Sequence, residues 1–175
     1  MVRAQDKTVL VVDDEPNVRS YLSQILEDAG FNVLTALDGD EALELIQERR
    51  PDFISLDLVM PRKSGRRLLY DLRKDKALSR IPVLIVTAHA TTDLGKGDLQ
   101  DLLDNRMMSG PGIYLEKPVN PLKYVRAIQR TLGVEESGDT EDKIGLKEQL
   151  QQTIQGASPE ALRKALDALK KTDKG

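Results

Sequence analysis

The sequence contains no cysteine and only one histidine among its 175 residues. Without cysteine, disulfide bonds, thiol catalysis and sulfur-ligated metal sites are excluded. No apolar run approaches the roughly 20 residues that cross a membrane, and residues 1–7 lack the apolar segment of a signal peptide. The net charge of −3, with both signs interspersed, argues against a nucleic-acid-binding surface. We therefore expect a cytoplasmic protein without membrane insertion, whose partners are proteins or small molecules.

Five short runs rich in Val, Ile and Leu alternate with segments in which apolar residues recur every three or four positions. Such runs are typical of strands in a parallel sheet that helices cover on both faces. Because strands and helices alternate, the connections are expected to be right-handed crossovers within a single α/β sheet. The expected strands are Thr8–Val12, Phe31–Ala36, Phe53–Leu56, Pro82–Val86 and Ile113–Leu115.

Reactive polar residues stand at or just past the ends of four of these runs. Asp13 and Asp14 follow the first run and Asp57 follows the third, while Thr87 ends the fourth and Lys117 follows the fifth. Ligands of doubly wound sheets bind outside the carboxyl ends of the strands, so these five side chains should converge on one crevice. Three carboxylates, a hydroxyl and an ammonium predict a site for a cation and a phosphoryl group.

The residue types indicate what each group in this crevice contributes. A carboxylate such as that of Asp57 can accept a phosphoryl group to give an acyl phosphate. Asp13 and Asp14 concentrate negative charge beside it, and hard oxygen ligands of this kind favour Mg²⁺ or Mn²⁺. Lys117 offers a fixed positive charge to one phosphoryl oxygen, and Thr87 offers a hydroxyl to another. An Asp at a strand end is often only a helix cap, but three acids together favour the cation site.

Five motifs, in this order along the chain, resemble those of the response-regulator receiver domain. They are the pair Asp13-Asp14, the run Asp57-Leu58-Val59-Met60-Pro61, Gly65, the pair Thr87-Ala88, and Tyr114 followed by Lys117-Pro118. The resemblance covers residues 7 to about 133. It implies a flavodoxin-like fold, a doubly wound sheet of five parallel strands in the order 2-1-3-4-5, here with a C-terminal helical extension.

The resemblance also implies roles for the acidic residues. Asp57 would take a phosphoryl group from a sensor histidine kinase or a histidine phosphotransfer protein. Asp14, Asp57 and the backbone carbonyl of Val59 would bind Mg²⁺ or Mn²⁺ directly. Asp13 would hold a metal-bound water.

For the remaining site residues the resemblance implies a switch. Lys117 would pair with Asp57 or its phosphate, and the Lys117–Pro118 bond is expected to be cis. Thr87 would move towards the phosphoryl group, and Tyr114 would follow from an outward to an inward rotamer. For Tyr114 the residues alone leave simple packing open as a competing interpretation.

His89 and the basic residues within 62–67 each have a purely structural interpretation as well as a functional one. His89 stands two positions past Thr87, where it and Val59 would flank the phosphoryl group and tune its hydrolysis; it fits an exposed loop residue equally well. The basic residues within 62–67 are more simply a solvated helix face than a docking patch.

Composition divides the chain into three parts. Residues 1–133 are expected to form the receiver domain. Residues 134–142, VEESGDTED, are acidic and almost free of apolar side chains, which predicts a linker. Residues 143–175 carry two helical patterns and form a tail whose leucine stripe fits packing on its own domain or binding of a partner. Glycine and proline within 88–112 predict long loops around a short fourth helix, about Asp98–Met108.

These features fit three functions to different degrees. The first is a two-component receiver, phosphorylated on Asp57, that signals by protein contacts with an unidentified target and has no DNA-binding output domain. It would not be an enzyme, because it promotes only its own phosphorylation and slow dephosphorylation. The second, a constitutive interaction module independent of phosphorylation, gives no reason for the acidic cluster. The third, a Mg²⁺-dependent phosphatase, lacks a second acid where Val59 stands.

Overall fold

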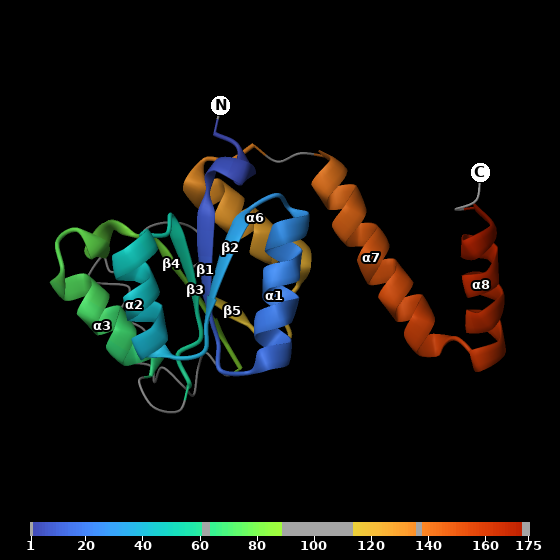
Figure 1. Cartoon of the computed structure of the whole chain (residues 1–175), viewed down its shortest axis with the longest axis horizontal. Helices are drawn as coiled ribbons and strands as arrows, with labels where there is room; N and C mark the ends of the chain where they lie inside the picture. Colours follow the sequence, from blue (N-terminus) through green and yellow to red (C-terminus); the bar gives the residue numbers. More distant parts are fainter. Residues whose placement is uncertain (1, 61–63, 89–113, 136–137, 173–175) are drawn as a thin grey trace. The chain divides into compact units, whose positions relative to one another are not determined.

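The computed structural model describes residues 2–60, 64–88, 114–135 and 138–172, in which strands and helices alternate as predicted (Figure 1). The strands are β1 (Thr8–Val12), β2 (Asn32–Ala36), β3 (Phe53–Leu56), β4 (Val83–Thr87) and β5 (Tyr114–Glu116). The α-helices are α1 (Pro16–Asp28), α2 (Gly39–Arg49), α3 (Gly65–Lys74), α6 (Pro121–Leu132), α7 (Gly138–Gly156) and α8 (Pro159–Thr172). Two short 3-10 helices are η1 (Ala4–Asp6) and η2 (Leu78–Arg80).

The five strands form one parallel sheet in the order β2-β1-β3-β4-β5, which confirms the predicted flavodoxin-like topology. In the pairing of β1 with β3, Val12 lies opposite Leu56. Helices α1 and α6 lie on one side of the sheet, and α2 and α3 lie on the other (Figure 1). All strands run the same way, so their carboxyl ends meet along one edge of the sheet.

Two strands begin one residue later than predicted, for backbone reasons. Phe31 lies in the turn that follows α1, where its N–H donates to the carbonyl of Leu26 at 3.0 Å. Pro82 has no N–H to donate to a ladder, so β4 begins at Val83, although the Pro82 carbonyl still accepts from Ile54 at 3.0 Å.

The helix boundaries follow the residues that the sequence places there. Pro16 occupies the first turn of α1, where its missing N–H costs nothing. Gly30 stops that helix with a φ of 87°, a left-handed conformation that a residue with a Cβ adopts at a cost. Asn120 begins α6 by accepting a hydrogen bond from the N–H of Lys123 at 2.9 Å.

The core is deepest around the two inner strands β1 and β3. All four residues of β3 and the last four of β1 are buried. The edge strands β2 and β5 are only partly buried, because each has a neighbouring strand on one side alone. The side of the sheet under α2 and α3 is filled by one apolar cluster, which includes Leu10, Val12, Ile46, Ile54, Leu56, Leu68 and Leu72.

The backbone divides into two compact units, residues 1–137 and 138–175. Helix α7 begins at Gly138, so the second half of the segment predicted as a linker is helical instead. Acidic residues favour the first turn of a helix, which explains this difference. In the second unit Leu146 and Leu150 of α7 and Leu166 of α8 are exposed. Helices α7 and α8 confirm the predicted C-terminal helical extension.

Some predicted features fall on residues that the structure does not describe. The fourth helix, about Asp98–Met108, and His89 both lie within 89–113, outside the described residues. Among the described residues, none of the helices is both long enough and apolar enough to cross a membrane.

Candidate functional site

The acidic residues predicted to converge do lie together at the carboxyl edge of the sheet. The N–H of Asp57 donates to the carbonyl of Val12 at 2.9 Å, which places the end of β3 beside the end of β1. One carboxylate oxygen from each of Asp13, Asp14 and Asp57 lies within 4.8 Å of the others. Two adjacent parallel strands thus bring three acids to one point.

These acids differ in burial. Asp13 is 1% exposed and Asp57 is 4% exposed, whereas Asp14 is only half-buried. Burial raises the pKa of Asp57, and hydrogen bonds from the Val59 N–H and Lys117 oppose this rise only in part. Burial likewise raises the pKa of Asp13, although Lys117 contacts it. Their charged forms are therefore costly in this buried place and favour a cation close by.

Lys117 is the cation at the centre of this cluster. Its Nζ lies 2.8 Å from Asp13 Oδ2, 3.0 Å from Asp57 Oδ2 and 3.2 Å from Glu15 Oε1. Burial lowers the pKa of Lys117, but the hydrogen bonds to Asp13 and Asp57 outweigh it and raise that pKa well above its usual value. The ammonium therefore stays charged at neutral pH and is shared among three carboxylates.

The backbone fixes the position of this lysine. The N–H of Lys117 donates to the carbonyl of Thr87 at 2.9 Å, which joins the ends of β5 and β4. The Lys117–Pro118 bond is cis, as the sequence resemblance implied. Thr87 itself is fully buried, at the end of β4 beside the acidic cluster.

The carboxylate of Asp57 is held on both oxygens. The N–H of Val59 donates to Oδ1 at 3.0 Å, and Lys117 Nζ lies 3.0 Å from Oδ2. Asp13 is held similarly, because its Oδ1 accepts from the N–H of Glu15 at 3.0 Å and its backbone carbonyl accepts from Arg19 at 2.6 Å. The acceptor groups are thus ordered in advance of any ligand.

Gly65 explains how α3 approaches the site so closely. A Cβ at position 65 would lie 2.0 Å from the backbone oxygen of Asp57 and 2.8 Å from the Cα of Leu58. No side chain fits into that space, so only glycine lets the first turn of α3 rest against the peptide that follows Asp57. The motif glycine of the sequence therefore has a steric cause.

Two of the predicted switch and tuning residues lie at the surface. Tyr114 is 41% exposed, as expected for an outward rotamer, and the side chain of Val59 is exposed next to Asp57.

The sequence analysis missed Glu15. This residue follows the acid pair directly, and its side chain contacts Lys117, yet no spacing rule distinguishes it from an ordinary surface acid. It also missed Ser55 of β3 and Tyr124 of α6, whose buried side chains interact with each other. Ser55 stands within an apolar run and Tyr124 within an amphipathic helix, where nothing in the sequence signals that the two meet.

The donor set suits a hard divalent cation. Three carboxylates with oxygens within 4.8 Å of one another form the arrangement that Mg²⁺ and Mn²⁺ favour. Burial raises the pKa of Asp13 and of Asp57, and the contacts with Lys117 oppose this rise only in part. A cation held by these acids would supply the missing positive charge.

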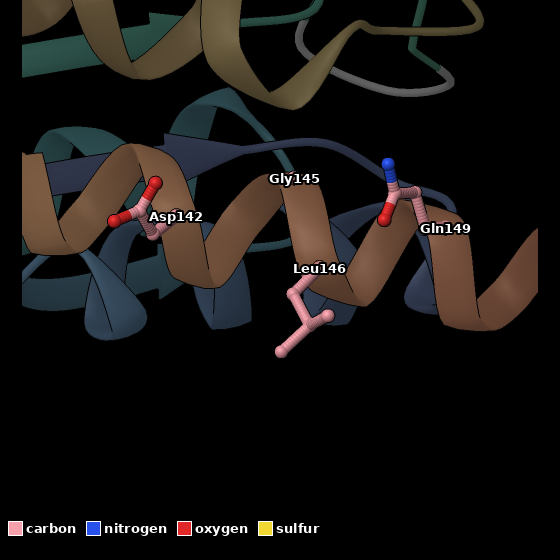
Figure 2. Close-up of a pocket in the computed structure, with 4 residues that line it drawn as sticks. All are labelled: Asp142, Gly145, Leu146 and Gln149. Atoms are coloured by element: carbon pink, nitrogen blue, oxygen red, sulfur yellow. The ribbon is translucent and has the colours of Figure 1, made fainter.

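A second concavity lies along α7, away from these acids in the sequence. Its lining residues all come from one stretch of that helix, residues 142–149 (Figure 2). They are Asp142, Gly145, Leu146 and Gln149. One carboxylate without a nearby cation or second acid in this lining provides no phosphoryl site, so we assign it no function.

Comparison with known proteins places the site in a family context. Residues 9–129 match the family model described as the response regulator receiver domain. The chain is 33% identical over 138 residues to the phosphate regulon transcriptional regulatory protein PhoB of Pseudomonas aeruginosa, covering 79% of this chain and 57% of PhoB. It is 32% identical over 127 residues to the polar-differentiation response regulator DivK of Brucella anthropi, covering 73% of this chain and 97% of DivK.

The solved structures agree with the curated relatives. The chemotaxis protein CheY4 of Vibrio cholerae superposes with a TM-score of 0.60 at 32% identity, over 71% of this chain and 97% of CheY4. A CheY-like receiver domain from Methanospirillum hungatei gives a TM-score of 0.62 at 26% identity, over 78% of this chain and 98% of that domain. The chain spans about half the length of PhoB and of several other curated relatives.

Proposed function

Because the chain belongs to the response-regulator receiver family, we propose that it accepts a phosphoryl group on Asp57 from a phosphohistidine. The donor would be a sensor histidine kinase or a histidine phosphotransfer protein. The observation that carries this proposal is the buried, pre-ordered carboxylate of Asp57, which lies beside two further acids and Lys117. A receiver domain is a phospho-acceptor in signalling and not an enzyme that turns over external substrates.

The transfer uses the groups at the carboxyl edge of the sheet. A carboxylate oxygen of Asp57 attacks the phosphorus, a P–O bond forms, and the P–N bond breaks as the departing imidazole keeps the bonding electrons. Lys117 Nζ, now 3.0 Å from Asp57 Oδ2, is in reach of the incoming phosphoryl oxygens and would stabilise their charge. The product is an acyl phosphate on β3.

Asp13, Asp14 and Asp57, with the backbone carbonyl of Val59, would hold Mg²⁺ or Mn²⁺ at this site. When bound, such a cation neutralises charge on the carboxylates and on the phosphoryl oxygens. Asp13, which is buried and contacts Lys117, would hold a water of that cation. The half-buried Asp14 is open to direct coordination.

The signal would leave the site through Thr87 and Tyr114. Thr87 is buried at the end of β4, and the exposed Tyr114 begins β5, the neighbouring strand. A shift of Thr87 towards the phosphoryl group would leave space for the Tyr114 ring to turn inward, which biases two existing states of this surface. We infer that output proceeds through protein contacts with a target still to be identified, with Val59 and His89 tuning the lifetime of the phosphate.

The test is the intact mass of the protein after incubation with acetyl phosphate and Mg²⁺. A phosphoryl-sized mass gain is expected in the parent and is absent in Asp57→Ala and in EDTA. Asp52→Ala, a change of the same type at the opposite end of β3, should phosphorylate like the parent. No gain in the parent with either acetyl phosphate or a phosphorylated histidine phosphotransfer domain would overturn the proposal in favour of a constitutive interaction module.

A further inference from the structure

Helix α3 presents an aromatic ring between two cations on its outward side. Tyr70 is 48% exposed, and the Arg67 guanidinium lies 5.8 Å and the Lys74 ammonium 4.3 Å from the centre of its ring. Arg67 and Lys74 lie one turn before and one turn after Tyr70, so all three share one helix face. We call these three residues the α3 face.

The folding of α3 does not require this face. The helix is anchored by Leu68, Leu69 and Leu72, which are buried in the apolar cluster under the sheet. Tyr70 contributes nothing to that cluster, because its ring lies on the opposite side of the helix in contact with the two cations. Tyrosine and arginine are both enriched where proteins bind one another.

The charge around the α3 face contrasts with that of the whole chain. Residues 64–80 contain six basic and two acidic residues, a net charge of +4, and Arg62 and Lys63 directly precede them. The whole chain carries −3, so the rest of it carries −7. Such a local reversal of charge attracts an anionic partner to α3 and away from the remaining surface.

We propose that the α3 face is a docking site for an acidic polypeptide segment of a partner protein. Carboxylates of such a segment would pair with Arg67 and Lys74, and the ring of Tyr70 would pack against the aliphatic part of a Glu side chain. The contacts of both cations with the ring already limit their freedom, which lowers the entropy lost on binding. The site is separate from Asp57 and does not depend on phosphorylation.

The dimensions and charges of the α3 face favour a peptide over a nucleic acid. From Arg67 to Lys74 the helix advances only about 10 Å, whereas specific duplex binders contact roughly six to ten phosphates. Asp71 lies within the same helix, paired with Arg67 at 3.4 Å, and would repel a continuous phosphate backbone. A short segment with spaced carboxylates can avoid Asp71, so it fits better.

The test is a fluorescence anisotropy titration of the full chain against a labelled hexaglutamate peptide, with labelled hexaglutamine as the uncharged probe. It is run at low and at physiological ionic strength, because exposed ion pairs weaken with salt. We expect binding of hexaglutamate alone, weakened at least about fivefold in Arg67→Gln/Lys74→Gln and also in Tyr70→Ala. The matched control is Arg163→Gln/Lys164→Gln on α8, which removes the same charge from two exposed positions and should bind like the parent.

Three results would overturn the proposal. They are failure of the parent to bind hexaglutamate in preference to hexaglutamine, an α8 control that weakens binding as much as the α3 variant does, and a short DNA duplex that binds more tightly than hexaglutamate at the same salt. Circular dichroism of each variant confirms that α3 and the sheet remain folded. Because the titration uses unphosphorylated protein, its failure leaves the acceptor role of Asp57 untouched.

Discussion

The ammonium of Lys117 is shared by Asp13, Asp57 and Glu15, at distances between 2.8 and 3.2 Å. The meeting of Asp13, Asp57 and Lys117 was predictable, since each directly follows an apolar run and parallel strands end at one edge. The third partner, Glu15, was not predictable, because its reach depends on the turn between β1 and α1. Strand spacing thus predicts which backbones meet but not which flexible side chains join them.

Replacing Lys117 by alanine separates phosphoryl stabilisation from metal binding. We expect Lys117→Ala to bind Mg²⁺ at least as tightly as the parent, because a competing cation is removed from the carboxylates. Phosphorylation by acetyl phosphate should slow about 100-fold, the scale on which one charged donor acts on a transferring group. Calorimetric titration with Mg²⁺ and time-resolved mass measurement give the two quantities.

Lys123→Ala is the matched control for this variant, since Lys123 is exposed on α6. It should leave both quantities unchanged. Parent-like phosphorylation in Lys117→Ala would show that the ammonium has no part in the transfer.

The charged carboxylate of Asp57 should lower the free energy of unfolding when no metal is present. Burial raises the pKa of Asp57, so the folded state binds this proton more tightly than the unfolded chain does. The free energy of unfolding therefore falls as pH rises from about 4 through the raised pKa. At pH 7 in EDTA we expect Asp57→Asn to raise Tm by about 2–4 °C. Scanning calorimetry of the variant and the parent at about pH 4 and at pH 7 measures this difference and its dependence on pH.

Asp52→Asn is the matched control, for which we expect the opposite change in Tm. Although burial raises the pKa of Asp52, hydrogen bonds from Lys7 and from the Thr8 N–H outweigh it and lower that pKa overall. Its stabilising effect is present above the unfolded pKa and is lost as pH falls, so the substitution should lower Tm at pH 7. Mg²⁺ should raise the Tm of the parent more than that of Asp57→Asn. A lower Tm for Asp57→Asn in EDTA would contradict this electrostatic argument.

At the scale of elements, α3 is joined to the phosphoryl site through its first residue. Because a Cβ at position 65 would lie 2.0 Å from the Asp57 oxygen, Gly65→Ala must push α3 away from that peptide. We expect a loss of about 1–3 kcal/mol in the free energy of unfolding, the usual cost of overpacking. Phosphorylation should also become slower. The peptide that α3 would push against directly precedes Val59, whose N–H holds the Asp57 carboxylate. Urea denaturation and the mass assay measure both effects.

Gly145→Ala provides the comparison, since nothing lies within 4 Å of a Cβ at position 145. It should increase helicity, because alanine favours a helix interior by roughly 1 kcal/mol over glycine. Phosphorylation should be unchanged. If Gly65→Ala were as harmless as Gly145→Ala, the close packing of α3 on Asp57 would be incorrect.

The elements themselves were largely predictable from local patterns. The bounds of β1 and β3 were predicted correctly because both strands are almost entirely buried and consist mostly of apolar residues. Errors arose where backbone hydrogen bonding decides, as at Phe31, whose N–H donates to Leu26 in the turn after α1, and at Pro82, which has no N–H to donate. The start of α7 at Gly138 was missed because an acidic, apolar-poor stretch resembles a linker and also favours a helix start.

For the whole molecule, the sheet order and the site were predictable because the motifs of a known family occur in register with the strands. The α3 face was not predictable. Its basic residues had a solvated surface as the simpler interpretation, and only the structure shows that Tyr70 lies exposed between Arg67 and Lys74. Surface arrangement depends on how a helix is rotated on its core, which composition does not determine.

The division into two units leads to a last prediction. Asp13, Asp57 and Lys117, with every hydrogen-bond partner described for them, lie within residues 1–137. A protein ending before Gly138 should therefore fold and accept a phosphoryl group at a rate within about twofold of the full chain, since sites that share no partners act additively. Mass measurement with acetyl phosphate, alongside calorimetry, checks both. A large loss of rate with an unchanged melting transition would mean that α7 and α8 act on the acceptor site, and the tail would then be a regulator rather than a separate interaction module.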